Sequence, residues 1–309
     1  MNKIKKIIKS NEYLFIFGIT LYNLYNQLLL WLSPDDVKFL RRQYKKRTKK
    51  SLNLESPSLF NEKIQYLKLY YRPAILKELV DKYEVRKFVE DKGFPQTLIP
   101  IFGVYNTYSD IQFSKLPNQF VMKLTNGSGQ NKLVFDKKQL KYKRTKWLVN
   151  SWQKINHYAI GREWGYKDVR NRIIIEKMLV DSQGNIPKDY KFMCFNGEPK
   201  VIGVYSDRFS KKFQRVLFDQ EWNPLTNRAI FEQNTETFAQ PKSFEQMFTI
   251  AKELSQGFPF VRIDMYEFEG KPYFGEMTFY PKGGYMEFED ERINQKLGDY
   301  LSLFKDIAI

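Results

Sequence analysis

Two segments near the C-terminus alternate between polar and apolar residues and predict a β-hairpin. The segments are Val261–Tyr266 and Tyr273–Thr278, and a short polar stretch around Gly270 separates them. Successive side chains of a strand point to opposite faces, so Arg262 and Asp264 share one face of the predicted hairpin. The pattern therefore places a cation beside an acid.

The register of this hairpin brings a second acid to the same place. If the turn holds the three residues Glu269–Lys271, Phe268 pairs with Pro272 and Asp264 lies opposite Glu276. Two carboxylates that face each other across a ladder repel unless a cation lies between them. That cation could be the neighbouring arginine or Mg²⁺, which proteins hold with one or two carboxylates. The sequence leaves open a nucleotide–metal site and a plain amphipathic hairpin with an Arg–Asp pair.

The chain from about Ser56 onward mixes helical and strand patterns. A period of 3.6 residues predicts helices, and a period of two or a short apolar run predicts strands. Strands grouped with few helices between them indicate an α+β fold rather than a regular parallel wrap. The expected helices are Ser58–Tyr70, a short one near Pro73, Asp81–Lys92, Tyr142–Lys154 and Phe244–Gln256, and the further strands are Leu98–Tyr105, Phe120–Leu124, Lys132–Phe135, Arg172–Met178, Asp189–Phe195 and Lys200–Tyr205.

The first fifty residues have a different character. Four lysines precede the apolar stretch Tyr13–Leu32, and the basic run Arg41–Lys50 follows it. About 20 apolar residues suffice to span a bilayer, but Asn23, Asn26 and Gln27 interrupt this stretch, and no cleavage site typical of a secretory signal follows it. A helix that lies on an anionic membrane surface fits best. The alternative is an ordinary helix packed on the protein, with a solvated basic run.

Composition limits the chemistry. The 309 residues carry a formal net charge of +16, with one cysteine and one histidine. The positive charge indicates an acidic partner, which could be nucleic acid, an anionic membrane, or a phosphorylated or carboxylated substrate. Histidine-rich zinc sites are excluded, and a catalytic triad would have to use His157, which we interpret as structural or at the surface. A lone Cys194 favours a reducing compartment without disulfides.

A glycine-rich loop joins two of the predicted strands. The loop Asn126–Gly129 follows Lys123 closely. Backbone amides of such a loop approach phosphate oxygens, and a nearby lysine supplies the countercharge. The loop is not a P-loop, because a strand follows it instead of a helix. Taken alone, it fits a plain Asn-Gly turn better than a phosphate site.

Two further strands carry polar groups in positions suited to a nucleotide. The segment Glu176–Leu179 ends an apolar strand, where backbone groups and aliphatic walls could hold an adenine, although any strand end offers the same. Lys191 lies inside the apolar run Asp189–Phe195 and therefore needs an anionic partner or an exposed edge.

Taken in order, these motifs resemble the ATP-grasp superfamily and, within it, the TupA-like family linked to bacterial cell-surface polysaccharides. The similarity covers roughly Ser56 to Phe304, and an ordered set of motifs is more specific than any one of them. The residues that carry it are Phe60–Gln65, Lys68–Tyr70, Asp81–Tyr83, Val85–Arg86, Leu98–Pro100, Gly103–Tyr105, Lys123, Asn126–Gly129, Gly161–Trp164, Tyr190–Phe192, Ser206–Phe209, Phe260–Asp264 and Gly275–Pro281.

The resemblance implies an ATP-grasp fold, in which ATP binds between two α+β subdomains after a short helical N-terminal region. The expected parts are a basic and apolar segment (1–50), a helical leading region (51–80), subdomain A with the glycine loop (81–178) and subdomain B with metal-binding carboxylates (179–309). The region before Asp81 is short for a full leading domain, which leaves the place of the acceptor open.

The resemblance also implies roles for individual residues. The expected nucleotide-binding residues are Lys123, Asn126, Gly127, Ser128, Gly129, Glu176, Lys177, Met178 and Leu179. The expected Mg²⁺ ligands are Asp264, Glu276 and Thr278, the last where many ATP-grasp enzymes have asparagine. The expected catalytic residues are Lys191, Arg262, Asp207 and Arg208. Arg162 and Lys282 join Asp207 and Arg208 as candidates for binding a carboxylate, with surface ion pairs as the alternative; Gly283 and Gly284 could offer amides to a reacting carbonyl or form a turn.

Three functions from different classes are compatible with the sequence. The first is a cytoplasmic ATP- and Mg²⁺-dependent ligase, free or at the inner membrane face, that joins an amine or amino acid to an acidic glycan or uronic acid. The second is a glycosyltransferase of the same pathway, but the Asp-x-Asp motif typical of such enzymes is absent. The third is a nucleic-acid-binding protein, which we do not expect because many basic residues lie in the N-terminal arm.

Overall fold

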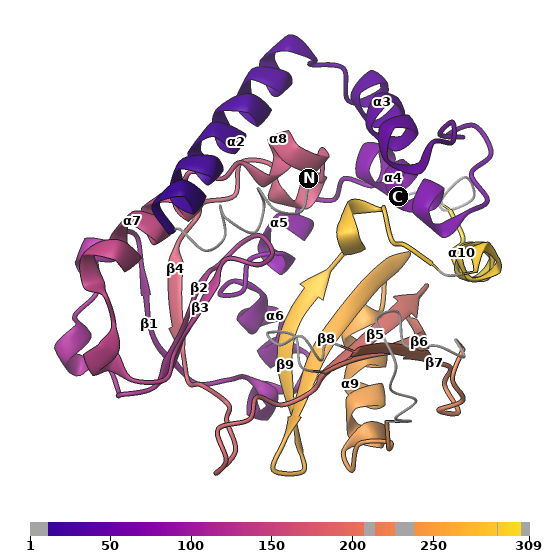
Figure 1. Cartoon of the computed structure of the whole chain (residues 1–309). Helices are drawn as coiled ribbons and strands as arrows, with labels where there is room; N and C mark the ends of the chain where they lie inside the picture. The colour runs from indigo at the N-terminus through magenta and orange to yellow at the C-terminus, as the bar shows by residue number, and fades with distance from the viewer. Residues whose placement is uncertain (1–11, 207–213, 226–237, 289, 304–309) are drawn as a thin grey trace. The chain divides into compact units, whose positions relative to one another are not determined.

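The chain is divided into two units, each with its own antiparallel β-sheet (Figure 1). The computed structural model describes residues 12–206, 214–225, 238–288 and 290–303. Unit 1 comprises Met1–Lys46, Pro73–Tyr83 and Pro100–Met178, and unit 2 comprises Arg47–Arg72, Glu84–Ile99 and Leu179–Ile309.

Unit 1 contains a four-stranded sheet in the order β1-β4-β2-β3. Its strands are β1 (Ile101–Tyr105), β2 (Phe120–Leu124), β3 (Asn131–Val134) and β4 (Ile173–Glu176). Its helices are α2 (Glu12–Leu32), α3 (Asp36–Thr48, which begins in this unit), α5 (Leu76–Leu79), α7 (Tyr142–Gln153) and α8 (His157–Gly161), with 3₁₀ turns at Tyr108–Asp110, Phe113–Lys115, Lys137–Gln139 and Trp164–Tyr166.

Helix α7 supplies one wall of the core of unit 1. Its buried residues Thr145, Leu148, Val149 and Trp152 recur every three or four positions and so form one stripe along the helix. Leu148, Val149 and Trp152 of this stripe belong to the same hydrophobic cluster as Phe120 and Met122 of β2 and Ile173 and Ile175 of β4. Helix α7 therefore packs on this sheet through buried apolar side chains of β2 and β4.

Unit 2 contains a five-stranded sheet in the order β7-β6-β5-β8-β9. Its strands are β5 (Asp189–Phe195), β6 (Glu198–Ser206), β7 (Gln214–Phe218), β8 (Phe260–Phe268) and β9 (Lys271–Thr278). Its helices are α4 (Phe60–Tyr70), α6 (Val85–Asp91), α9 (Phe244–Ser255) and α10 (Glu291–Tyr300), with 3₁₀ turns at Pro95–Thr97 and Pro281–Gly283. The sequence analysis did not anticipate β7.

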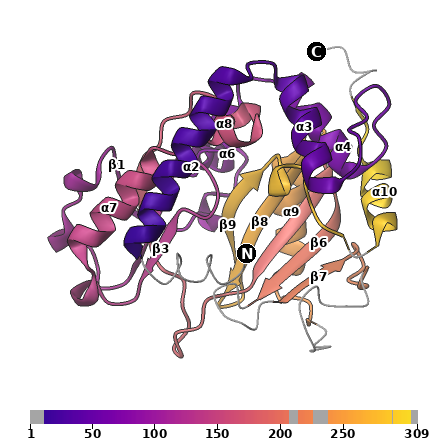
Figure 2. The ribbon, with the colours of Figure 1, turned by 45° about the horizontal axis from the view of Figure 1, so that its top comes forward.

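One face of the unit 2 sheet is covered by α9, which packs on β5, β6 and β8 (Figure 2). The buried residues Met247, Ile250, Ala251 and Leu254 line the inner side of this helix at helical spacing. Because α9 buries one face of the sheet, polar side chains that alternate onto the other face gather there.

The N-terminal helix α2 packs on α7 and α8. Ile16 and Ile19 pack against the core of unit 1, and Asn23 and Asn26 are buried. Within the described part of the chain, no helix combines the length and the apolar character that crossing a bilayer requires.

Candidate functional site

Charged side chains from three neighbouring strands of unit 2 meet on one face of its sheet. Lys191 of β5 is the register partner of Asp264 of β8, and Asp264 is in turn the partner of Glu276 of β9. Arg262 and Thr278 form the next pair of the β8–β9 ladder on the same face, two positions away. Adjacent strands place register partners side by side, so five predicted site residues form one cluster, which we call the β8–β9 cluster.

The hairpin has the predicted pairing of Asp264 with Glu276, but its turn differs from the predicted one. Phe268 pairs with Lys271 rather than with Pro272, so the predicted three-residue turn is wrong. The turn has two residues, Glu269 and Gly270, with φ of 53° and 72°, as a tight hairpin turn requires. A β-bulge beyond Asp264 adds one residue on β9 and restores the predicted pairing of Asp264 with Glu276.

The arginine of the cluster is the cation that lies between the two acids. Arg262 Nε is 2.6 Å from Asp264 Oδ1, and its Nη2 is 2.7 Å from Oδ2 of the same carboxylate. The same Nη2 donates to Thr278 Oγ1 at 3.1 Å and lies 3.8 Å from Glu276 Oε1. This bidentate geometry fixes the orientation of Asp264.

A buried lysine completes the cluster from the other side. Lys191 Nζ forms ion pairs with Asp264 and, at 3.0 Å, with Asp189 Oδ2. The side chains of Lys191 and Asp264 are only 6% and 2% exposed. A charge at such depth is tolerated only when it is paired and hydrogen-bonded, which is why a lysine occurs inside this apolar strand.

Burial and charge pairing act in opposite directions on these groups. Burial raises the pKa of the Asp264 carboxyl above its usual range, and the cations of Arg262 and Lys191 offset only part of this rise. Burial lowers the pKa of Arg262, but the charge of Asp264 outweighs this effect, so that the pKa of Arg262 lies above its usual range. The guanidinium therefore stays charged.

The oxygen atoms of the cluster fit a hard divalent cation in their chemistry. Asp264, Glu276 and Thr278 offer two carboxylates and a hydroxyl, and Mg²⁺ takes few protein oxygens together with phosphate oxygens. The Glu276 side chain is 30% exposed and so remains accessible. No group of three or more His, Cys, Asp and Glu side chains with metal-binding spacing occurs in the described residues. Two carboxylates and a hydroxyl leave the remaining positions of an octahedral Mg²⁺ to water or phosphate oxygens.

Unit 1 contains a second, smaller ion pair between neighbouring strands. Lys123 Nζ of β2 lies 2.5 Å from Glu176 Oε2, at the end of β4. The amide of Lys177 donates to the carbonyl oxygen of Pro100 at 2.8 Å, and the side chains of Met178 and Leu179 are buried. The amide N–H of Lys177 is therefore already hydrogen-bonded within the protein.

The glycine loop after β2 is held in place by the segment that follows α5. Lys82 Nζ donates to the carbonyl oxygen of Gly127 at 2.9 Å, and the Lys82 amide donates to that of Thr125 at 2.6 Å. Asp81 forms an ion pair with Arg172 at 3.1 Å. Gly127 and Gly129 have φ of 83° and 85°, a backbone conformation that favours glycine. Lys82 is a site residue that the sequence analysis did not single out.

The only histidine of the chain lies directly against this loop. A Cβ atom on Gly127 would be 2.0 Å from His157 Nε2. His157 Nε2, Asn126 Oδ1 and Gln130 Oε1 are buried and have no hydrogen-bond partner among the described residues. Burial, with a smaller effect from the charge of Lys82, lowers the pKa of His157 to about 4. The imidazole is therefore neutral near pH 7.

The described residues that were predicted to contact the carboxylate substrate lie outside the β8–β9 cluster. Arg162 is fully buried, pairs with Asp36 at 3.0 Å and stacks on Phe39, so its hypothesised role in binding a carboxylate is wrong. The amides of Gly283 and Gly284 close a turn onto the carbonyl oxygens of Tyr280 and Pro281, which selects the turn over the amide site. Asp207 and Arg208 lie outside the described residues.

Helix α4 holds the loop that follows β9. Gln65 Nε2 donates to the carbonyl oxygens of Gly283 and Gly284 at 3.0 and 2.9 Å, and Lys68 Nζ donates to Gly283 at 2.6 Å. Asn61 exchanges hydrogen bonds with the backbone of Met286. These contacts explain why the segment Phe60–Tyr70 carries polar residues on a face that is buried rather than exposed to solvent.

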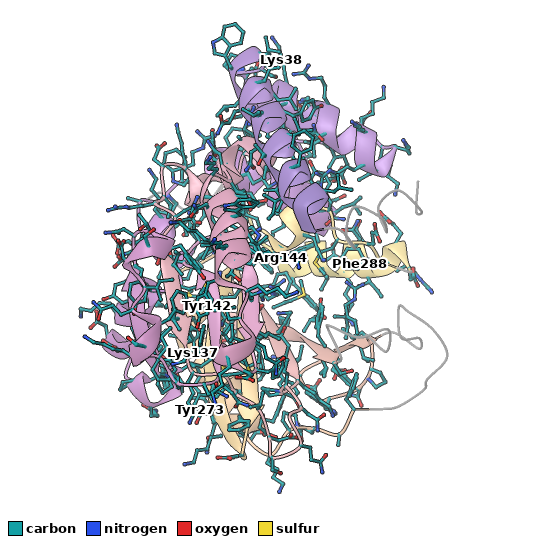
Figure 3. All side chains as sticks on the ribbon, turned by 60° about the vertical axis from the view of Figure 1, so that its left-hand side comes forward. Lys38, Lys137, Tyr142, Arg144, Tyr273 and Phe288 are labelled. Atoms are coloured by element: carbon teal, nitrogen blue, oxygen red, sulfur yellow. The ribbon has the colours of Figure 1, made fainter. Side chains whose placement is uncertain are left out.

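A cavity of about 330 Å³ lies between β3 and the start of α7 in unit 1. Its lining includes Lys132, Asp136, Lys141 and Arg144, the last of which is labelled in Figure 3. The lining is basic, and the loop residues Asn126–Gly129 are not part of it.

Comparison with known proteins identifies one family. A sequence model of the family described as TupA-like ATPgrasp matches residues 62–302. No curated protein matches the chain. Similar solved structures include a D-alanine–D-alanine ligase from Bacillus anthracis, with 18% identity, a TM-score of 0.39 and coverage of 66% of this chain and 59% of that one. An L-amino acid ligase from Bacillus licheniformis has 13% identity, a TM-score of 0.42 and coverage of 81% and 55%. The chain thus spans less than two thirds of either ligase.

Proposed function

Because the chain belongs to the TupA-like ATP-grasp family, we propose that it is an ATP-dependent ligase that joins a carboxylate to an amine. The family match confirms the predicted family and the predicted ATP-grasp fold of α+β type. The observation that best supports the activity is the β8–β9 cluster, in which a buried lysine and a bidentate arginine surround Asp264.

The proposed reaction has two steps. A carboxylate oxygen of the substrate attacks the γ-phosphorus of ATP, which forms an acylphosphate and releases ADP. The nitrogen of the amine then attacks the acyl carbon, the phosphate leaves with the bonding electron pair, and loss of a proton from nitrogen gives the amide. Both steps depend on positioning and charge neutralisation more than on a protein nucleophile.

Each charged group of the site has a place in this proposal. Lys123 and the loop Asn126–Gly129 bind phosphate oxygens, and Glu176–Leu179 lies against the adenine. Lys191 and Arg262 neutralise the charge that develops on the transferred phosphoryl group. Asp264, Glu276 and Thr278 would hold Mg²⁺, which, when bound, neutralises phosphate charge and orients it for in-line transfer. Asp207 and Arg208 remain predicted contacts of the carboxylate substrate.

We propose an acidic cell-surface glycan or its uronic-acid precursor as the carboxylate substrate. The net charge of +16 favours polyanionic substrates by electrostatic attraction. The need for ATP and the single, buried, free Cys194 support a reducing, cytoplasmic setting. The amine is an amino acid or a related compound.

The test offers the purified protein ATP, Mg²⁺ and an oligogalacturonate, with hydroxylamine as a small amine. We expect ADP and phosphate release in equal amounts and formation of a hydroxamate, because hydroxylamine captures the acylphosphate. Asp264→Asn and Glu276→Gln each remove a carboxylate charge without changing shape, and we expect kcat to fall by about 100-fold or more. A matched control is Glu267→Gln, farther along β8, which should retain activity.

Two results would contradict the proposal. The first is consumption of a nucleotide-sugar with UDP release while ATP is ignored, which is the outcome expected of a glycosyltransferase. The second is ADP release that does not depend on any carboxylate and yields no hydroxamate.

A further inference from the structure

Helix α2 carries an exposed apolar stripe on the side opposite its contacts with the rest of unit 1. Six residues, Phe17, Leu21, Leu24, Leu28, Trp31 and Leu32, have 51% to 77% of their surface exposed. At about 100° per residue they fall within an arc of about 100° along the helix. Monomeric proteins rarely expose apolar side chains in such continuity without a partner.

The opposite side of the same helix is fixed to the protein. Ile16 and Ile19 pack against the core, and Asn23 and Asn26 are buried on this side. Asn26 donates to the carbonyl oxygen of Tyr22 at 2.7 Å, and Asn23 donates to that of Ser151 at 3.5 Å. Two of the three amides that interrupt the apolar stretch, Asn23 and Asn26, therefore face the protein, whereas Gln27 is exposed and lies outside the arc of the six apolar residues.

A buried ion pair fixes the helix that follows. Arg162 donates to the carbonyl oxygen of Ser33 at 3.1 Å and pairs with Asp36 at the start of α3. Tyr158 donates to the other oxygen of Asp36 at 2.7 Å. These contacts hold the junction of α2 and α3 on unit 1, so the stripe cannot rotate inward without breaking them.

Basic residues outnumber acidic ones in the segments that flank the stripe, where Asp35 pairs with Lys38 at 3.6 Å and Asp36 pairs with Arg162. Helix α2 has no charged residue after Glu12. Four lysines precede it in the sequence, and α3 exposes Lys38, labelled in Figure 3, together with Arg41 and Lys45 on one face. Apolar side chains beside exposed cations are the combination that binds the surface of an anionic bilayer. Pairing of two copies is opposed by the net charge of +16.

We propose that the stripe of α2 docks unit 1 on a bilayer that contains anionic lipid, with α2 lying along the interface rather than crossing it. The apolar side chains enter the boundary between headgroups and acyl chains, and the basic face of α3 contacts the headgroups. This inference does not depend on the proposed ligase activity.

The test measures how the full chain partitions onto vesicles by flotation. The vesicles contain phosphatidylcholine alone or phosphatidylcholine with an equal part of phosphatidylglycerol. We expect binding to the mixed vesicles that weakens in high salt. Phe17→Ser/Leu21→Ser/Leu28→Ser should lower the partition coefficient at least about tenfold. Arg41→Gln/Lys45→Gln should lower it about fivefold per charge, and only on the anionic vesicles.

Matched variants separate docking from general effects on surface or folding. Ile75→Ser/Phe102→Ser/Phe135→Ser removes three apolar side chains of unit 1 that are 40% to 46% exposed but lie outside α2. Lys242→Gln/Lys296→Gln removes two exposed cations elsewhere. Both should bind vesicles as the unmodified chain does, and all variants should keep its thermal unfolding temperature.

Three outcomes would overturn the proposal. One is failure of the unmodified chain to float with either kind of vesicle. Another is unchanged partitioning of the stripe variant. The last is a dimer, detected by light scattering, that the stripe variant abolishes, because the stripe would then be an interface between copies.

Discussion

Lys123 of unit 1 and Lys191 of unit 2 both lie on a strand beside an acid, but they differ in burial and in the number of acids they contact. Lys191 is 6% exposed and neutralises two buried acids, Asp189 and Asp264. Lys123 is 15% exposed and pairs with Glu176 alone. The buried charges of the unit 2 site are thus paired with one another, whereas the unit 1 site borders a loop with buried polar atoms that have no hydrogen-bond partner among the described residues.

Several buried polar atoms of unit 1 lie at the glycine loop. Asn126 Oδ1, Gln130 Oε1 and His157 Nε2 are buried there without a hydrogen-bond partner among the residues that the structure describes. A buried polar atom without a partner costs about 1–3 kcal/mol. The comparison teaches that unit 2 pairs its buried charges with one another, while the polar atoms at the loop of unit 1 are available to bind water or a ligand.

The largest expected effect concerns the two lysines. Lys191→Met leaves two buried acids with less countercharge, so we expect it to lower the free energy of unfolding by about 4 kcal/mol. Lys123→Met leaves one buried acid, Glu176, without its cation and should cost about 2 kcal/mol. Urea denaturation followed by circular dichroism measures both.

A second substitution shows whether charge is the cause. Adding Asp264→Asn to Lys191→Met removes the acid left without its lysine and should recover part of the loss. Equal losses in the two lysine variants, or no recovery in the double variant, would contradict the contrast between the sites.

The next effect is a pH dependence confined to unit 1. The folded state lowers the pKa of His157 from 6.5 to about 4, so the unfolded chain binds a proton more readily. The stability that the neutral imidazole contributes is complete above about pH 6.5 and is lost as the pH falls towards 4. Between about pH 8 and pH 5 the loss should be about 2 kcal/mol.

The control for this prediction is His157→Gln, which cannot be protonated in that range. Carboxylates elsewhere titrate in both proteins, so the quantity to compare is the difference in unfolding free energy between them. A difference that stays constant from pH 8 to pH 5 would mean that His157 is not kept neutral by the fold.

The smallest effect separates the two glycines of the loop. Gly127→Ala and Gly129→Ala both place alanine at a positive φ, which costs about 1 kcal/mol. Only Gly127→Ala also collides with His157, whereas a Cβ on Gly129 meets no atom within 4 Å. We expect Gly127→Ala to weaken ATP binding about tenfold more than Gly129→Ala does, as measured by calorimetry.

The double variant Gly127→Ala/His157→Ala removes the collision and leaves only the backbone strain. It should bind ATP about as well as Gly129→Ala. If it binds no better than Gly127→Ala, the contact with His157 does not set the position of the loop.

The sequence predicted the contacts that lie within one hairpin better than those between distant segments. The pairing of Asp264 with Glu276 followed from strand alternation, even though the turn was misjudged by one residue. The contact of His157 with Gly127 joins residues 30 positions apart, and neither residue has a local pattern that indicates it. Lys82 was visible only as part of an Asp-Lys-Tyr motif, without a hint of its loop contact.

Helix α2 shows a different limit of prediction. Its sequence is apolar on two sides, one against unit 1 and one exposed. Hydropathy sums both sides, so the sequence alone did not show which apolar residues of the stretch pack on the protein and which are exposed. Arg162 was misjudged for a related reason, since a sequence does not reveal that a charged side chain is fully buried against α3.

The bulge between Asp264 and Met265 also separates the tip of the hairpin from its base. It absorbs one residue at Gly275, where a Cβ would lie 2.9 Å from the carbonyl oxygen of Asp264. The pairs between the bulge and the turn are therefore shifted by one residue relative to the pair of Asp264 with Glu276. A peptide epitope or fluorescent label grafted at Glu269–Gly270 would leave Asp264 facing Glu276, which makes the tip a natural attachment point for probes of the site.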